Sequence, residues 1–467
     1  MAEYTLLIGG ESVVGDRTTD VVNPATETVL ATAPCASEAQ LEAAVAAARE
    51  AFPGWRARPI AERAKVVGDI AAVIEANAAE LIELMTREQG KPIAVATQEI
   101  HGAVAFFRYV ASLDLPVRVL EDTDAKRVEV HRVPLGVVAA ILPWNFPLLL
   151  LAFKLPAALL AGNTVVVKPA PTTPLVTLRW GSLIRDLVPP GVVNVVADRD
   201  DLGPLLVTHP DVRKVSFTGS VETGKHVMAA AADSLKRLTL ELGGNDAGIV
   251  LDDVDPKEVA PKVFWGAFAN SGQICVSVKR LYVHTSMYDQ VCAELATLAR
   301  AAVVGDGLHP DTTIGPVQNR EQFEKVRAMI DDARRHGRII AGGEVPDRPG
   351  FFISPTIVRD IGPGALVVDE EQFGPVLPVI EYDDVDEAIE AANVSPYGLG
   401  ATVWGTDLEK AHDVARRLES GTVWINHHLD FHPGVPFAGA KHSGAGVELG
   451  EEGLAEFTQL QVINMLR

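Results

Sequence analysis

Short, almost uninterrupted apolar segments alternate with helical segments through the middle of the chain. Strands are predicted at 133–142 (VPLGVVAAIL), 164–169 (TVVVKP), 192–197 (VVNVVA), 212–217 (VRKVSF) and 237–242 (RLTLEL). Helices are predicted between them, at 147–161, 174–187 and 221–232. Strands that are apolar on both faces are typical of a parallel sheet, because each crossover covers one face with a helix. The sequence therefore predicts an α/β fold built on a parallel sheet.

A second series of the same kind follows residue 243. Its strands are predicted at 247–251, 280–284, 338–342, 376–382 and 422–426, and its helices include 287–302 and 318–336. Apolar residues at helical spacing also predict helices at 38–52, 59–88 and 92–112, before the first series. A chain of 467 residues has room for about three domains. We therefore expect the second series to form a second α/β domain.

Two segments have a different pattern of apolar and polar residues. Residues 116–133 alternate charged residues with valine, which predicts a two-stranded antiparallel hairpin with one solvated face. Residues 457–466 (FTQLQVINML) predict a strand at the end of the chain. Because the open edges of strands pair with other strands, we expect these segments to contact a partner subunit.

Charge and cysteine content exclude several classes of protein. Lys and Arg number 41 against 62 Asp and Glu, so the formal net charge is −21, which makes nucleic acid an unfavourable partner. Three cysteines are too few for a disulfide scaffold, so we expect a reducing, cytoplasmic compartment.

The N-terminus has Glu3 and no basic segment before an apolar core, so we expect no signal peptide. The uncharged segment 136–153 has the length of a membrane span, but Pro143 and Pro147 break any helix there, so we expect no membrane partner.

One of the three cysteines is a candidate nucleophile. Cys275 lies in a loop of small and polar residues, NSGQIC, between a predicted helix and a predicted strand. A thiol in such a loop ionises more easily than a thiol in the core, although an inert packing role explains a lone cysteine equally well. Cys292 falls within a predicted helix and Cys35 follows Pro34 near a turn, so neither has an evident helper.

Two polar residues stand in otherwise apolar surroundings. Glu241 closes a buried strand, where a perturbed pKa would suit a general base, but a structural ion pair is the alternative. Asn145 lies between Trp144 and Phe146 in a turn framed by two prolines. A buried amide must be hydrogen-bonded, and its NH2 group could also face a developing oxyanion.

The candidate nucleotide-binding residues follow other strands. Gly219, Ser220 and Gly224 lie where the strand 212–217 gives way to a helix, and a helix N-terminus attracts anions, although an ordinary turn has the same residues. Lys168 ends the strand 164–169, at the edge where parallel sheets bind ligands, unless it only extends to solvent. His427, His428 and His432 could suggest a metal, but Pro433 and Gly434 argue against a helix that would align them, so we predict no metal site.

Taken together, these segments resemble the aldehyde dehydrogenase superfamily over nearly the whole chain. The resemblance rests on the order and spacing of seven motifs: PWNFP (143–147), FKLPAALLAGNTVVVKPA (153–170), FTGSVETG (217–224), LELGG (240–244), SGQIC (271–275), EEQFGP (370–375) and GTVWIN (421–426).

The resemblance implies a subunit of three parts. These are a Rossmann-like nucleotide-binding domain (1–113 and 133–242), an α/β catalytic domain (243–440) and a small β bridging element (114–132 and 441–467) that makes a homodimer or homotetramer. The implied cofactor is NAD or NADP. Many family members have Glu three residues after the lysine that matches Lys168, whereas this chain has Pro171 there, so the choice between the two cofactors stays open.

The resemblance also implies a role for each matching residue. Cys275 would be the nucleophile, Glu241 the base, and Asn145 part of the oxyanion hole, with Lys154 supporting the site. Cofactor contacts would come from Trp144, Lys168, Gly219, Ser220, Gly224, Glu371 and Phe373.

The implied reaction oxidises an aldehyde to a carboxylic acid through a thiohemiacetal and a thioester on Cys275. The alternatives are a CoA-acylating relative, which Glu241 disfavours, and an inactive binding or structural relative. Apolar residues near the thiol, such as Ile274 and Val276, suggest an apolar tunnel for aliphatic or aromatic aldehydes.

Overall fold

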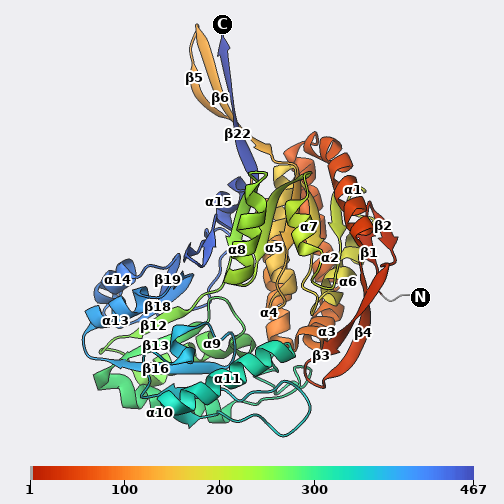
Figure 1. The fold of residues 1–467 in the computed structure, drawn as a ribbon. Coiled ribbons are helices and arrows are strands. Elements are labelled where there is room, and N and C mark those ends of the chain that lie inside the picture. The colour runs from red at the N-terminus through yellow and green to blue at the C-terminus, as the bar shows by residue number, and fades with distance from the viewer. Residues whose placement is uncertain (1–3) are drawn as a thin grey trace.

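The largest sheet of the computed structural model, which describes residues 4–467, is doubly wound (Figure 1). Its strand order is β2-β1-β9-β8-β7-β10-β11-β21, with β2 (Glu11–Val13) and β1 (Leu6–Ile8) at one edge and β21 (Gly444–Ala445) at the other. The neighbours from β9 to β11 are parallel. The parallel strands are β7 (Val137–Ile141), β8 (Thr164–Lys168), β9 (Val193–Val195), β10 (Val212–Thr218) and β11 (Arg237–Glu241). The chain builds outward from β7 to β9 and then returns to the other side of β7. The strand order therefore reverses between β7 and β10, which is where ligands bind in sheets of this kind.

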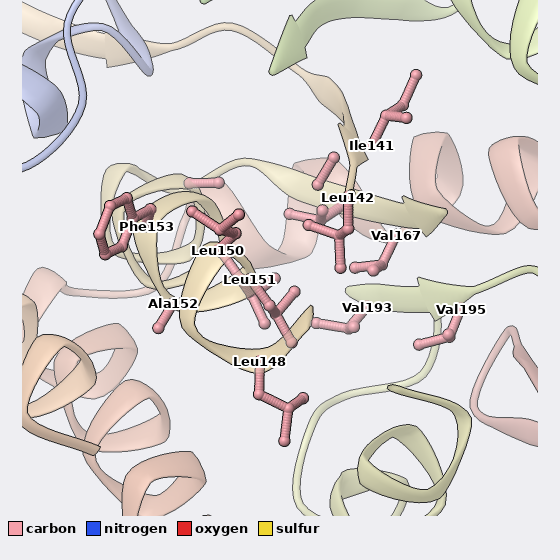
Figure 2. Packing of buried hydrophobic residues seen from close by; sticks show 14 of the residues in the cluster. Ile141, Leu142, Leu148, Leu150, Leu151, Ala152, Phe153, Val167, Val193 and Val195 are labelled. Atoms are coloured by element: carbon pink, nitrogen blue, oxygen red, sulfur yellow. The ribbon is translucent and has the colours of Figure 1, made fainter. Parts of the chain in front are cut away.

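The prolines and a glycine set the limits of helix α5 (Pro147–Ala161), which follows β7. Pro147 occupies the first turn, where its missing N–H is not needed, and Gly162 ends the helix with φ of 97°. Nearly every residue of α5 is buried, and its Leu148, Leu150 and Leu151 belong to one buried cluster with Val167 of β8 and Val193 of β9 (Figure 2). The uncharged segment 136–153 is thus a buried strand, a turn and a buried helix, as predicted. In residues 4–467, every helix is too short or too polar to cross a bilayer.

A second sheet, of mainly parallel strands, confirms the second α/β series. Its order is β14-β15-β16-β13-β12-β18-β19, and only β14 is antiparallel to its neighbour. The strands are β12 (Asp246–Val250), β13 (Val278–His284), β14 (Arg338–Ala341), β15 (Thr356–Arg359), β16 (Val376–Tyr382), β18 (Gly400–Trp404) and β19 (Thr422–Ile425). The mixed α/β fold class is therefore confirmed.

One predicted helix is wrong. The segment 59–88 forms two helices, α2 (Ile60–Ala76) and α3 (Ala78–Gln89), which meet at Asn77. The side-chain amide of Asn77 donates to the carbonyl of Val73 at 2.8 Å, so it competes with the helical backbone pattern at that point.

The hairpin and the final strand form a small sheet that projects from the body (Figure 1). The order is β22-β6-β5, from β5 (Arg118–Asp122), β6 (Lys126–Pro134) and β22 (Thr458–Leu466). Both predicted elements are confirmed, and β22 pairs with β6 over its full length. A short strand before it, β21 (Gly444–Ala445), pairs with β11 instead, so that part of the tail lies on the large sheet. The boundaries of the three domains stay a prediction.

Candidate active site

The carboxyl ends of the parallel strands meet a loop of the second α/β unit at one place. Asn145 follows β7, Glu241 closes β11, and Cys275 lies in the loop before β13. These three residues line the same two cavities, one on each side of the thiol. The sequence interpretation placed them on separate elements, and the fold brings them together.

An unusual backbone holds the thiol loop. Helix α9 (Pro256–Phe268) runs into a short turn, Ala269–Gly272, in which Asn270, Ser271 and Gly272 all have positive φ, at 50°, 58° and 72°. A left-handed conformation costs a non-glycine residue about 1–2 kcal/mol. The hydroxyl of Ser271 offsets part of this cost by donating to the carbonyl of Gly315 at 2.9 Å. The loop therefore presents Cys275 in one fixed arrangement.

The Cys275 thiol is partly buried, and its surroundings disfavour the ionised form. Its pKa lies well above the usual value, first because burial removes water and second because the Glu241 carboxylate is near, although Lys279 acts in the opposite direction. Lys279 donates to the carbonyl of Ile274 at 2.9 Å and to that of Cys275. At rest the group is therefore a thiol, and it needs a base when it reacts.

The other two cysteines lie in the core. Cys35 and Cys292 are both buried, and burial raises the pKa of each thiol, to about 12 for Cys292. Cys292 lies within α10 (Thr285–Ala301), as the sequence interpretation has it. Neither borders the two cavities.

Glu241 is a buried carboxyl group without a hydrogen bond in the described part of the chain. It faces the thiol of Cys275 and the hydroxyl of Thr218 but meets neither at hydrogen-bonding geometry. Burial, and next the Glu448 carboxylate, raise its pKa from 4.5 to about 7. A base of that pKa is half-ionised at neutral pH, which suits proton transfer.

Lys154 lies behind this carboxyl group. Its ammonium group is buried in α5, donates to Thr218 at 2.7 Å and forms an ion pair with Glu448. Lys154 also favours the ionised form of Glu241, against the effect of Glu448. The charge of Lys154 thus lowers the pKa of Glu241, although Lys154 does not line either cavity.

The side chain of Asn145 is held by the thiol loop. Its NH2 group donates to the carbonyl of Gln273 at 3.0 Å, and the side chain of Asn270 donates to the backbone carbonyl of Asn145 at 3.2 Å. These bonds hold the Asn145 amide in the wall of the cavities that Cys275 also lines.

The smaller of the two cavities, about 160 Å³, lies over the ends of β7, β10 and β11. The side chains of Trp144 and Phe373 meet across it edge to face, with ring centroids 5.3 Å apart. The N–H of Gly244 and the ammonium of Lys279 bind the Glu371 carboxylate, at 3.0 and 3.3 Å. The other lining residues are Pro143, Asn145, Thr218, Gly219, Ser220, Glu241, Leu242, Gly243, Cys275, Gln322 and Lys325.

The backbone around this cavity fits a nucleotide. Ser220, which lines the cavity, caps helix α8 (Val221–Ala232) by accepting from the Thr223 N–H at 3.1 Å, so the N-terminus of α8 lies next to the cavity. A Cβ atom on Gly243 would lie 2.3 Å from Glu371, so only glycine leaves the carboxylate its place. The cavity wall thus combines aromatic rings, a carboxylate and the start of a helix, which are groups that can contact a nucleotide.

Two predicted cofactor residues lie outside the cavity. Lys168, at the end of β8, pairs with the buried Asp198 at 2.8 Å and lies 4.0 Å from Asp200. Gly224 packs against Leu242, where a Cβ atom would come within 2.5 Å, so it brings α8 close to the sheet. Their contacts with a cofactor stay a prediction.

The larger cavity, about 300 Å³, is mainly apolar. It lies between α4 (Ile93–Ala111), α5 and the loop around Phe431. Aromatic rings pack in its wall: Phe153 lies 4.8 Å from Phe106, and Phe431 lies 5.3 Å from Phe437 and 6.2 Å from Phe153, between centroids. Its polar lining residues are Gln98, Glu99, Asn145, Glu241, Cys275 and Asp430.

The three histidines do not converge. The Nε2 atom of His428 lies 2.6 Å from the Val276 carbonyl, and its ring meets the Trp424 ring edge to face. Burial lowers the pKa of His428 to about 3. His427 faces Asp430 at 3.7 Å and His432 lies against Tyr109. Within residues 4–467, no three His, Cys, Asp or Glu side chains are grouped so that they could hold a metal ion.

The sequence interpretation missed several residues that shape the site. Lys91, Glu99, Thr218, Gln273, Lys279 and Glu448 all contact a proposed catalytic group or its loop. Of these, Thr218 lies in the motif FTGSVETG and Gln273 in the motif SGQIC, but neither was given a role. The others become visible only when the fold buries their charges together.

The comparisons with known proteins agree with this geometry. The model of the aldehyde dehydrogenase family matches residues 13–463. The chain is 40% identical to the phenylacetaldehyde dehydrogenase of Pseudomonas fluorescens over 474 residues, covering 97% of this chain and 94% of the relative. The NAD+ complex of aldehyde dehydrogenase from Bacillus cereus superposes with a TM-score of 0.97 at 38% identity, covering 99% and 96% of the two chains. An NADP-dependent enzyme of E. coli gives 0.97 at 36% identity, covering 99% and 98%.

The fold and the site define a nucleotide-dependent oxidoreductase. The chain belongs to the aldehyde dehydrogenase family. Its reaction is the oxidation of an aldehyde to a carboxylic acid with NAD or NADP, through a thiohemiacetal and a thioester.

Proposed function

We propose that Cys275, Glu241 and Asn145 carry out this oxidation. The observation that supports the assignment is their shared position: all three line both the apolar cavity and the cavity over the sheet. A substrate in one cavity and a cofactor in the other would therefore meet at the thiol.

Each group has a defined task in this proposal. The sulfur of Cys275 bonds to the aldehyde carbon while the thiol proton passes to solvent in the open cavity. The amide of Asn145 donates to the oxygen that becomes negative. After oxidation leaves a thioester on Cys275, Glu241 takes a proton from water and the water oxygen bonds to the acyl carbon. The C–S bond then breaks, and the sulfur takes up the proton that Glu241 holds, which restores the thiol and the carboxylate.

Residues around the smaller cavity would hold the cofactor, which supplies the two-electron oxidant when bound. We propose that Trp144, Phe373 and Glu371 hold the nicotinamide end, and that Gly219 and Ser220 meet the phosphates. Lys168 and Gly224 would act from the adenosine side and from the base of α8. The choice between NAD and NADP stays open, because Pro171 provides no carboxylate to a ribose.

We propose an apolar aldehyde with an aromatic ring as the substrate. The wall of the larger cavity is mainly apolar and contains Phe106, Phe153, Phe431 and Phe437, and rings pack well against rings. The name of the Pseudomonas fluorescens relative, phenylacetaldehyde dehydrogenase, points the same way. A panel of aldehydes, run with NAD and with NADP, tests this assignment; a preference for charged aldehydes would overturn it.

The decisive experiment uses Glu241→Gln. If Glu241 activates water, the variant should produce one burst of reduced cofactor, about one per subunit, and mass spectrometry should find the acyl group on Cys275. Undiminished steady turnover in water would remove Glu241 from the proposal. Acceleration of the wild type by CoA would favour the CoA-acylating alternative, and no cofactor reduction with any aldehyde would favour an inactive relative.

We also propose a homodimer or homotetramer in the cytoplasm. The projecting sheet exposes Leu460, Val462 and Leu466 on β22 and Val119 and Leu120 on β5, and such an apolar edge favours a second copy as its partner. Sedimentation of Val462→Asp should show a smaller species than the wild type; unchanged sedimentation would argue against this interface.

A further inference from the structure

A fully buried ion pair lies behind the turn that contains Asn145. Lys91, which follows α3, and Glu99, in α4, have side chains that are both 0% exposed. Desolvating two charges offsets much of their attraction, so a buried pair is weak evidence for stability. Its other contacts indicate a different role.

The ammonium of Lys91 reaches the turn itself. Besides Glu99, it donates to the backbone carbonyl of Asn145 at 2.7 Å, and it lies 3.7 Å from the centre of the Phe146 ring. The same Asn145 carbonyl accepts from Asn270 of the thiol loop. Lys91 therefore joins the Asn145 backbone to the loop that presents Cys275.

The carboxylate of Glu99 reaches the other side of the turn. One of its oxygens accepts from the N–H groups of Leu148 and Leu149, at 3.0 and 3.1 Å. These lie in the first turn of α5, where backbone N–H groups have no partner within the helix. The ion pair thus holds the residues on both sides of the Asn145 side chain.

We propose that Lys91 and Glu99 are positioning residues for the Asn145 amide, an inference that rests on the oxyanion role proposed for Asn145. Neither contacts the reacting sulfur: Lys91 lies outside both cavities, and Glu99 lines the apolar cavity with its oxygens already engaged. They act by fixing the backbone from which the amide projects. A displacement of 1 Å at such a donor lowers a rate by about 100-fold.

The test compares two reactions of Cys275 in Lys91→Met and Glu99→Gln. Aldehyde oxidation needs the oxyanion donor, whereas alkylation of the thiol by iodoacetamide does not. We expect kcat for the aldehyde to fall about 10- to 100-fold, with the alkylation rate and the cofactor dissociation constant, read from tryptophan fluorescence, within about twofold of the wild type. In an Asn145→Ala background, the same changes should cost less than about threefold, because the amide they position is gone.

Control variants keep the inference falsifiable. Lys65→Met breaks an exposed pair with Asp69 and should change none of the three measurements. If Lys91→Met does not fold, Glu99→Asp, which shortens the carboxylate by one carbon, takes its place. An equal fall of oxidation, alkylation and cofactor binding, or losses that add fully to that of Asn145→Ala, would overturn the positioning role. Wild-type turnover by Asn145→Ala alone would instead overturn the proposed oxyanion role.

Discussion

The two cavities that meet at Cys275 have walls of different chemical character. The larger one lies among α4, α5 and the Phe431 loop and is walled by aliphatic and aromatic side chains. The smaller one lies at the strand ends and the start of α8, and its wall contains glycines, hydroxyl groups, Glu371 and Lys325. Only Asn145, Glu241 and Cys275 belong to both.

This difference separates binding from chemistry. An apolar aldehyde gains from burial in the larger cavity, and a charged nucleotide gains from backbone N–H groups around the smaller one. A change in either wall should therefore affect one ligand, whereas a change in the three shared groups should affect the reaction.

The largest effect is expected for Cys275→Ser. A hydroxyl group is far harder to ionise than a thiol, and both steps of the reaction use the sulfur, so kcat should fall by at least about 10⁴-fold. Cofactor binding, measured by fluorescence, should stay unchanged, because the smaller cavity keeps its wall. Residual turnover above about 1% of the wild type would show that the chemistry does not depend on the shared thiol.

The pH dependence should report the shared acid. Because the pKa of Glu241 is raised to about 7, the ionised base is lost as pH falls, and hydrolysis of the thioester should drop about tenfold per pH unit below 7.

The raised pKa of Glu241 also means that ionisation of this carboxyl group opposes folding. The penalty is absent below pH 4.5, grows while only the unfolded carboxyl group is ionised, and is constant above pH 7.

Glu241→Gln removes that penalty. Relative to the wild type, the variant should therefore gain roughly 2–3 kcal/mol of unfolding free energy between pH 5 and pH 8. Urea unfolding at the two pH values checks this difference. An equal difference at both would mean that the carboxyl group titrates normally, and hence that it is not buried between the cavities as described.

Much of this comparison could be predicted from the sequence. The apolar strands were predicted, with Glu241 at the end of one and Asn145 in the turn after another. The resemblance to aldehyde dehydrogenases put both residues in one site, whereas the strand pattern alone does not tell which strands are neighbours. The loop residues before Cys275 stood out because Gly272 and its small neighbours permit close approach. In the structure, a Cβ atom on Gly272 would lie 2.4 Å from the Gly374 carbonyl.

The supporting charges could not be predicted in the same way. Lys91 and Glu448 look like ordinary surface residues in sequence, because nothing local marks a lysine or glutamate as buried. Their partners are far along the chain: Glu448 is 294 residues from Lys154, and Asn145 is 54 residues from Lys91. The break at Asn77 was missed because one residue leaves the helical conformation, with φ −111° and ψ 18°, inside a regular apolar pattern.

Changes to one wall should give smaller and separable effects. Phe431→Ala removes a ring that packs against Phe153, Trp424 and Phe437. Losing one aromatic contact, about 1 kcal/mol, should raise KM for an arylalkyl aldehyde by 5- to 10-fold and leave the cofactor dissociation constant unchanged. Steady-state kinetics with an aromatic and a short aliphatic aldehyde checks it, because the aliphatic substrate should be less affected.

The matching change in the other wall is Ser220→Ala, with the smallest expected effect. The Ser220 hydroxyl accepts from the Thr223 N–H and so holds the first turn of α8 at the edge of the smaller cavity. Without this cap, which contributes about 1 kcal/mol, that turn is less ordered, and the cofactor dissociation constant should rise about three- to fivefold. The aldehyde KM at saturating cofactor should stay the same. If Ser220→Ala changed the aldehyde KM instead, the two walls would be coupled through the thiol loop, and the separation between binding and chemistry would not hold.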